Sequence, residues 1–293
     1  MNFTSKKPAF EHLRKKWIAK HSSLQNKLLD KHGAQLRHFT VGSLGGLLLL
    51  AAPTTGFLPS PQLIADSGQV TKDTDKNAAL ADELSQKIPK EIRVLTPEEE
   101  TDIGNILTKN FGFPVTAVLD GKRLNRSYGL IGGEQHLYRY PGDTLFKHAG
   151  NASDWAMYGS SGMAPGLGAW GYFVPSQAEF DETIKEREKY YIAVQTFLAP
   201  GFAENVKEYR DFFKFRKMLL VNPKTGQSVI TDIGDAGPAA WTGKHLGGSP
   251  EVMHFLGLAE GPRKGPVLYF FIDDSNDTIP LGPIKVSEKI AKT

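Results

Sequence analysis

Hydrophobic and polar positions divide this chain into three stretches of different character. No ionised residue lies between Arg37 and Asp66, and within that interval residues 39–58 form a run of twenty uncharged, mostly apolar positions. Residues 59–90 are polar, whereas residues 91–293 contain short apolar runs separated by turn residues. This pattern predicts a membrane-spanning helix, a polar linker and a folded domain, in that order.

Residues 39–58 suit a single transmembrane helix, because twenty residues at about 1.5 Å each reach across the hydrocarbon core of a bilayer. A buried core helix and a cleavable signal peptide are the alternatives, and we favour an uncleaved signal anchor. Nine Lys or Arg against two acidic residues give residues 1–38 a net charge of +7. The positive-inside rule then keeps this basic leader in the cytoplasm and places residues 91–293 outside, in a single-pass protein of the cell membrane.

The domain after the linker is predicted to be mainly β with short helices, an α+β arrangement. Thr96 followed by Pro97 and Glu99 is typical of a helix N-terminus, and Asp120-Gly121 is typical of a hairpin turn. Residues 125–175 are rich in Gly, Tyr and Trp without regular periodicity, which predicts short strands joined by loops. We expect helices near residues 96–110, 178–190 and 249–257, and strands at 115–119, 122–124, 190–196, 219–221, 228–233 and 266–273.

The most informative stretch spans residues 219–257. Asn222-Pro223 with Gly226 is typical of a type I turn closed by a glycine bulge, so we expect a hairpin here. The second strand leads into a loop that places Asp235 between two glycines, just before a Gly-Pro pair. Ser249-Pro250 then begins a short helix, as an N-cap followed by a first-turn proline.

This order of strand, turn, strand, acidic Gly-Pro loop and helix resembles the core of the double-psi β-barrel in the rare lipoprotein A and expansin-like families. The matching residues are Asn222, Gly226, Ser228, Val229, Asp235, Gly237, Pro238, Gly243, Lys244 (Arg in the family), Leu256 and Gly257. Residues 155–159, Trp-Ala-Met-Tyr-Gly, resemble the family's opening motif. The acidic residue that the family has just before its helix is Gly247 here, and its early Gly-Glu pair and Ala-Ala-His segment have no clear counterpart.

The resemblance implies a six-stranded double-psi-like barrel. Barrels of this family in cell envelopes bind peptidoglycan or other polysaccharides, and some of them cleave the glycan. The resemblance therefore implies a cell-wall polysaccharide as the partner of residues 91–293.

Asp235 is the candidate catalytic residue, because a carboxylate between glycines is open to a substrate. A lytic transglycosylase can work with one acid, which protonates the leaving oxygen and then helps the sugar's own 6-hydroxyl to close an anhydro ring. Asp232 lies nearby in the sequence, and repulsion between the two carboxylates would raise one pKa into a useful range. The alternative is structural, with Asp235 capping its loop by accepting backbone hydrogen bonds.

Aromatic and basic residues on the glycine-rich segments are candidates for contacts with sugar rings. The candidates are Trp155, Tyr158, Trp170, Trp241, Lys244 and His245. For each aromatic taken alone a core position is the ordinary alternative. Trp241 is the exception, because it directly follows the loop of Asp235.

Composition excludes several classes of protein. The chain contains no cysteine, which removes thiol nucleophiles, thiolate metal sites and disulfides. The formal net charge of +3 comes from the leader, so nothing favours a nucleic-acid partner for the domain. The G-x-G-x-x-G string at residues 166–171 opens no helix, which argues against a dinucleotide. We expect neither a cofactor nor a metal.

Three other interpretations of the chain stay open. His148 and Asp154 with Glu251 and His254 loosely resemble the ligand pattern of zinc D,D-peptidases of the cell wall, a less favoured alternative. The sequence thus predicts a membrane-anchored envelope protein that binds and cleaves glycan with Asp235. A non-catalytic glycan-binding module and an envelope scaffold are the other possibilities.

Overall fold

A computed structural model gives the structure of residues 67–287, with side chains described from residue 76 onward. The predicted leader (1–38) and membrane segment (39–58) lie outside the described residues. Within the described part of the chain, no helix combines the length and the apolar character that crossing a bilayer requires.

Six strands form a closed barrel in the order β9-β4-β8-β5-β7-β6, because β6 pairs with both β7 and β9. The strands are β4 (Tyr128–Gly133), β5 (Tyr191–Val194), β6 (Lys217–Val221), β7 (Ser228–Ala236), β8 (Leu246–Gly248) and β9 (Lys264–Ile272). Two pairs, β4 with β8 and β5 with β7, are parallel, and the other four are antiparallel. The predicted closed six-stranded barrel with short helices is confirmed.

Short strands and helices surround the barrel. β1 (Val115–Thr116) pairs with β9, β10 (Gly282–Ile284) pairs with β7, and β2 (Val118–Leu119) forms a separate hairpin with β3 (Lys122–Arg123). The helices are α2 (Ser67–Ser85), α3 (Pro97–Phe111), α4 (Ala152–Tyr158), α5 (Glu182–Lys189), α6 (Val206–Phe213) and α7 (Pro250–Phe255), with 3-10 turns η1 (Leu145–Lys147), η2 (Gly159–Ser161), η3 (Gln177–Glu179), η4 (Thr196–Leu198) and η5 (Ala240–Thr242).

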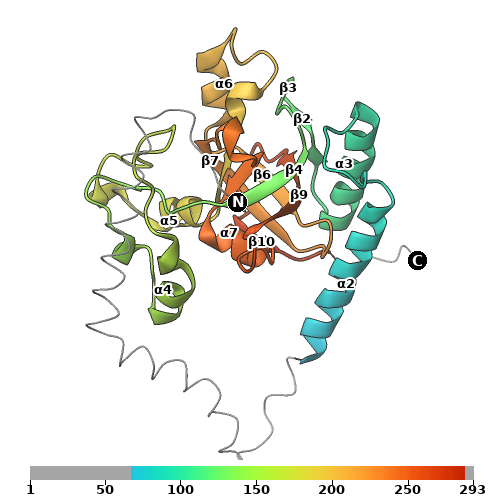
Figure 1. Cartoon of the computed structure of the whole chain (residues 1–293), viewed down its shortest axis with the longest axis horizontal. Helices are drawn as coiled ribbons and strands as arrows, with labels where there is room; N and C mark the ends of the chain where they lie inside the picture. The colour runs from blue at the N-terminus through green and yellow to red at the C-terminus, as the bar shows by residue number, and fades with distance from the viewer. Residues whose placement is uncertain (1–66, 288–293) are drawn as a thin grey trace, which may run out of the picture. The chain divides into compact units, whose positions relative to one another are not determined.

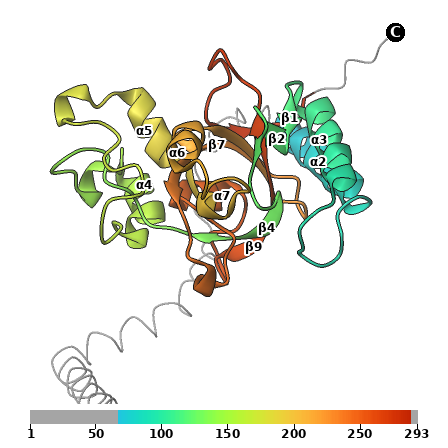
Figure 2. The same ribbon diagram turned by 90° about the horizontal axis from the view of Figure 1, so that it is seen from above.

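In Figures 1 and 2, α2 and α3 lie on one side of the barrel, and the segment with α4 and α5 lies on the other. Helices at 97–111, 182–189 and 250–255 fall where the sequence predicts them. Helices α4 and α6 were not predicted. With these two helices added to the predicted ones, the fold is mixed α and β rather than mainly β.

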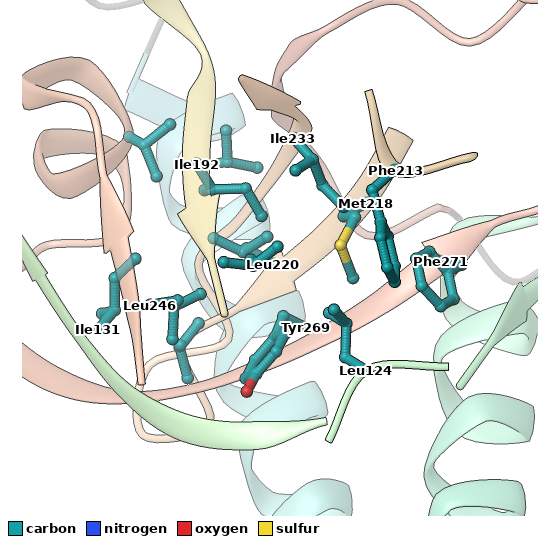
Figure 3. Close-up of a cluster of buried hydrophobic side chains, with 14 of the residues drawn as sticks. Leu124, Ile131, Ile192, Phe213, Met218, Leu220, Ile233, Leu246, Tyr269 and Phe271 are labelled. Carbon is teal, nitrogen blue, oxygen red and sulfur yellow. The ribbon is translucent and has the colours of Figure 1, made fainter. Parts of the chain in front are cut away.

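Alternate residues of the barrel strands face two different hydrophobic cores. In β6, Met218 and Leu220 point into the barrel, where they meet Ile192, Ile233 and other side chains of Figure 3. Leu219, next along the strand, belongs to a second core outside the barrel that also contains residues of α2 and α3. Because successive side chains of a strand point to opposite faces, an unbroken apolar run such as β6 indicates burial on both sides.

The second core corrects the predicted linker at residues 59–90. Leu80 and Leu84 of α2 are 1 % and 0 % exposed and pack with Leu107 of α3. Part of that polar stretch is therefore an amphipathic helix of the folded domain. The predicted start of α3 is confirmed, since Thr96 and Glu99 form a reciprocal capping box.

The predicted hairpin between β6 and β7 is also confirmed. The backbone oxygen of Asn222 accepts from Gly226 N at 2.8 Å, and Gly226 has the left-handed φ of 72° that a glycine bulge requires. A Cβ at Gly226 would overlap the backbone of Asn77 in α2, so this glycine also permits close packing. The turn is thereby fixed before β7 leads to Asp235.

Candidate functional site

Asp235 lies near the end of β7, directly after a β-bulge. In the register of β5 with β7, Ile192 pairs with Ile233 and Ala193 pairs with Asp235, so Gly234 is the extra residue. Ile192 and Ile233 fill the barrel core. Directly paired residues share a face, so the bulge turns Asp235 to the outer face of the barrel.

The two oxygens of Asp235 have different surroundings. Oδ1 accepts from the backbone N–H groups of Ala169 at 2.5 Å and of Ala236 at 2.7 Å. No group within the described residues donates to Oδ2. Burial raises the pKa of Asp235, and the two backbone hydrogen bonds oppose the rise in part. Asp235 therefore caps its loop, as the structural alternative expects, and keeps one oxygen available.

The loop around Ala169 is held against Asp235 by an aromatic and a basic side chain. Trp170 donates its indole N–H to the backbone oxygen of Ile233 at 3.0 Å, and its ring packs against the barrel core. Arg210 lies 5.2 Å from the centre of the Trp170 ring and donates to the backbone oxygen of Ala169 at 2.8 Å. Trp170 thus positions the loop and is half-buried, rather than presenting an open face.

Small residues occupy the paired positions on neighbouring strands between Asp235 and a second carboxylate, Glu134. Gly132 pairs with Gly247, Gly247 with Ala193, and Ala193 with Asp235. A Cβ at Gly247 would overlap the side chain of Glu134, and one at Gly132 would overlap Lys244. The glycines therefore leave space that two longer side chains fill.

Glu134 and Lys244 form an ion pair in that space. Lys244 Nζ lies 2.7 Å from Glu134 Oε1, and a pocket of 230 Å³ opens beside them. The pocket is lined by Gly132, Gly133, Glu134, Gln135, Ser161, Lys244, Arg263 and Lys264. The sequence identified Lys244 but missed Glu134; the available signal was an acidic residue directly after a strand that ends in two glycines.

Tyr191 shows that several carboxylates gather at this end of β5. Its side chain is buried, and its hydroxyl donates to the backbone oxygen of Gln135. Burial raises the pKa of Tyr191 well above its usual value, and four carboxylates act in the same direction. In decreasing order of effect they are Glu188, Glu134, Asp235 and Glu251. Asp235 and Glu134 are thus close enough to act on the same side chain.

Asp232 does not join Asp235. Both of its oxygens are buried without a hydrogen-bond partner in the described residues, and the nearest cation is Arg187, with Nε at 3.9 Å. Burial raises the pKa of Asp232 well above its usual value, which Arg187 and Lys217 only partly offset. The expected cause, repulsion between Asp232 and Asp235, does not account for either shift.

The other predicted contact residues are spread over several surroundings. Trp241 on η5 is 88 % exposed, after the Asp235 loop. His245 is structural, since its Nδ1 accepts from Leu130 N at 2.9 Å. Trp155 and Tyr158 lie on α4 at a separate small cavity, where Trp155 is 44 % exposed and Tyr158 is buried.

A buried network of charges was not predicted as a unit. His148 donates from Nε2 to Asp143 at 3.0 Å and from Nδ1 to Glu188 at 2.9 Å. Burial alone would lower the pKa of His148, but these two carboxylates raise it to about 9. Although burial opposes it, hydrogen bonds from His136 and His148 lower the pKa of Glu188 to about 2.

The peptidase-like residues share a neighbourhood without forming the expected ligand set. His148 and Asp154 line the small cavity next to α4, and the centres of the His254 and Tyr158 rings lie 5.8 Å apart in a T-shaped arrangement. Within the described residues, the group with metal-ligand spacing is instead His136, His148 and Glu188.

Comparison of the chain with protein-family models, with curated proteins and with solved structures finds no match.

Proposed function

We propose that this chain is a membrane-anchored cell-envelope protein whose barrel binds and cleaves peptidoglycan or a related glycan, with Asp235 as the acid and base. The observation that supports this most is the state of Asp235. Two backbone N–H groups fix one of its oxygens, the other has no donor among the described residues, and burial raises its pKa. A carboxylic acid that keeps its proton longer and presents one oriented oxygen suits general acid catalysis.

The chemistry needs only one such group. The protonated Oδ2 of Asp235 donates its proton to the glycosidic oxygen as the bond to the anomeric carbon breaks. The resulting carboxylate then accepts the proton of the sugar's 6-hydroxyl, whose oxygen bonds to the anomeric carbon and closes an anhydro ring. Asp235 ends the cycle protonated again, without an external reagent.

Glu134 and Lys244 serve in this proposal as substrate-binding groups. They form an ion pair, and both side chains can hydrogen-bond sugar hydroxyl or acetamide groups beside the 230 Å³ pocket. Gly247 stands where the double-psi families have an acidic residue, and Glu134 brings a carboxylate to the same place from β4. Two parallel pairs within a closed six-stranded barrel further support a double-psi topology.

The test compares two aspartates of the same strand. Asp235→Asn keeps the shape and the acceptor oxygen but removes the ionisable proton, so anhydro-sugar product per unit of enzyme should fall about a hundredfold or more. Asp232→Asn, the matched control, should keep the wild-type rate. The measurement is mass spectrometry of products from purified peptidoglycan strands incubated with full-length protein in detergent. Equal product from Asp235→Asn and wild type would contradict the catalytic role.

A non-catalytic glycan-binding module is the second candidate, supported by the 88 % exposure of Trp241. An indole this exposed can stack on a sugar ring without any change in the fold. In that case wild-type protein yields no anhydro product, and Trp241→Ala weakens sedimentation with peptidoglycan while Asp235→Asn does not. Binding lost in neither variant would count against glycan recognition at this end of the barrel.

A further inference from the structure

Three metal-ligating side chains from three separate segments converge next to the barrel. His136 follows β4, His148 follows η1, and Glu188 lies in the last turn of α5. One atom from each side chain lies within 4.8 Å of the others. The three side chains are 2 %, 2 % and 3 % exposed. Glu188 Oε1 lies 3.3 Å from His136 Nδ1, and Glu188 Oε2 lies 2.9 Å from His148 Nδ1.

The outer contacts of His148 are those that a metal-bound histidine commonly makes. Its Nε2 donates to Asp143 at 3.0 Å, and the guanidinium of Arg139 donates two hydrogen bonds of 2.8 and 2.9 Å to the same carboxylate. A carboxylate at the far ring nitrogen fixes the orientation of the imidazole and increases its basicity as a ligand. The Nδ1 atom of His148 is thereby directed toward Glu188.

A small cavity lies beside these donors, and a second buried carboxylate interacts electrostatically with two of them. His136 and His148 line a cavity, together with Asp154 and Tyr158, that has room for about one water molecule. Glu251 is 5 % exposed, and its Oε2 has no hydrogen-bond partner within the described residues. The charges of Glu188 and His136 both act on Glu251. A nearby cation would satisfy this buried oxygen, which otherwise costs stability.

We propose that His136, His148 and Glu188 bind one divalent transition-metal ion of the zinc type, with a water in the fourth position on the cavity side. The ion replaces the hydrogens that the two Nδ1 atoms share with Glu188, while Asp143 keeps the hydrogen on His148 Nε2. Two imidazoles and a carboxylate suit Zn²⁺, whereas Mg²⁺ and Ca²⁺ prefer sites made of oxygen alone.

The ion would join the two ends of one insertion. His136 and Glu188 stand at the start and the end of the segment between β4 and β5, and His148 lies inside it. Binding would therefore fasten this segment to the barrel and stabilise the folded protein by mass action. The site does not depend on the proposed glycan chemistry, because Asp235 and Glu134 are not among its ligands.

The experiment measures metal binding by the purified full-length chain in detergent, after treatment with a chelator. We expect one Co²⁺ per chain, the visible absorption bands of a tetrahedral nitrogen and oxygen site, and displacement of Co²⁺ by Zn²⁺ but not by Mg²⁺. Zn²⁺ should also raise the melting temperature. A folded wild-type chain that takes up no stoichiometric ion would overturn the proposal.

Variants then locate the ion. His136→Gln should abolish stoichiometric binding, and Asp143→Asn should weaken it about 10- to 100-fold. His254→Gln is the control, since the exposed His254 belongs to the peptidase-like pattern, and it should bind as wild type does. Binding that survives His136→Gln but is lost in His254→Gln would contradict this ligand set. If His136→Gln does not fold by circular dichroism, unchanged affinity in Asp143→Asn is the result that counts against the site.

Discussion

At the scale of single residues, Asp232 and Asp235 differ because different segments cover them. Both lie on β7, but Asp232 is enclosed by Arg187 of α5 and Lys217 of β6, whereas Asp235 meets the backbone of Ala169. Burial is the main cause of the raised pKa of each. The two shifts have different consequences, because hydrogen bonds orient Asp235, whereas Asp232 accepts none within the described part of the chain.

Asp232→Asn should stabilise the protein at neutral and alkaline pH. The unfolded chain releases the Asp232 proton above a pKa of about 3.9, while the folded protein keeps it because burial raises the pKa there. The free energy of unfolding therefore falls as pH rises between those two pKa values, by up to about 1.4 kcal/mol per pH unit. Asparagine does not titrate, so urea unfolding should show the stability of the variant increasing relative to wild type as the pH rises above about 4.

Asp274→Asn is the control of opposite sign. Although burial opposes it, hydrogen bonds with Lys217, Ile279 and Thr278 hold the pKa of Asp274 below its usual range. Its stabilising effect is present above the unfolded pKa and is lost as pH falls through the folded pKa. Asp274→Asn should therefore destabilise the protein at pH 7. The same pH trend in both variants would contradict these assignments.

At the scale of elements, the strands of the barrel are shared between two cores, and α2 completes the outer one. Leu84 of α2 is fully buried against residues of α3 and of the barrel exterior. The carboxylates of the candidate site lie elsewhere on the barrel, with Asp235 on the outer face of β7 and Glu134 directly after β4. The barrel thus supports packing on one side and polar chemistry on another.

Leu84→Ala tests whether α2 belongs to the folded domain. Removing a buried leucine from a packed core should lower the free energy of unfolding by about 2–5 kcal/mol. The exposed Asp82, two residues earlier in the same helix, gives the control Asp82→Ala, which should change stability by no more than about 0.5 kcal/mol. Denaturant unfolding followed by tryptophan fluorescence provides the measurement. Equal midpoints for both variants would mean that residues 67–85 act as a spacer.

At the scale of the whole molecule, attachment to a membrane is a prediction from the sequence alone. The uncharged residues 39–58 follow a leader of net charge +7, which favours an uncleaved anchor with the domain outside. Replacing Leu47–Leu50 with two Lys and two Glu should move the full-length protein from the membrane pellet to the supernatant, because charged residues at a bilayer centre are costly. Protease added to spheroplasts should remove the wild-type domain and spare the leader. Recovery of wild-type protein in the soluble fraction would contradict the anchor.

Local sequence signals determined the elements with strong turn and cap chemistry. The capping box at Thr96, the turn at Asn222 to Gly226 and the buried run of β9 each depend on neighbouring residues, so their positions were predictable. The loop of Asp235 was predictable for the same reason. The short strand β8 was not predicted because three residues give no periodic signal, and helix α6 was missed although Val206, Tyr209 and Phe213 recur at helical spacing.

The tertiary structure alone decided which side chains meet. Glu134 approaches Lys244 across 110 positions of sequence, and Glu188 reaches His148 across 40. These contacts follow from closing the barrel and folding the segment between β4 and β5 against it, and no local pattern encodes them. The same packing separated Asp232 from Asp235, although they are close in sequence, because burial depends on what covers a residue and not on its neighbours in the chain. The sequence therefore determined the elements with local turn and cap signals and the position of Asp235, and packing in three dimensions decided its partners, its pKa and the buried histidine cluster.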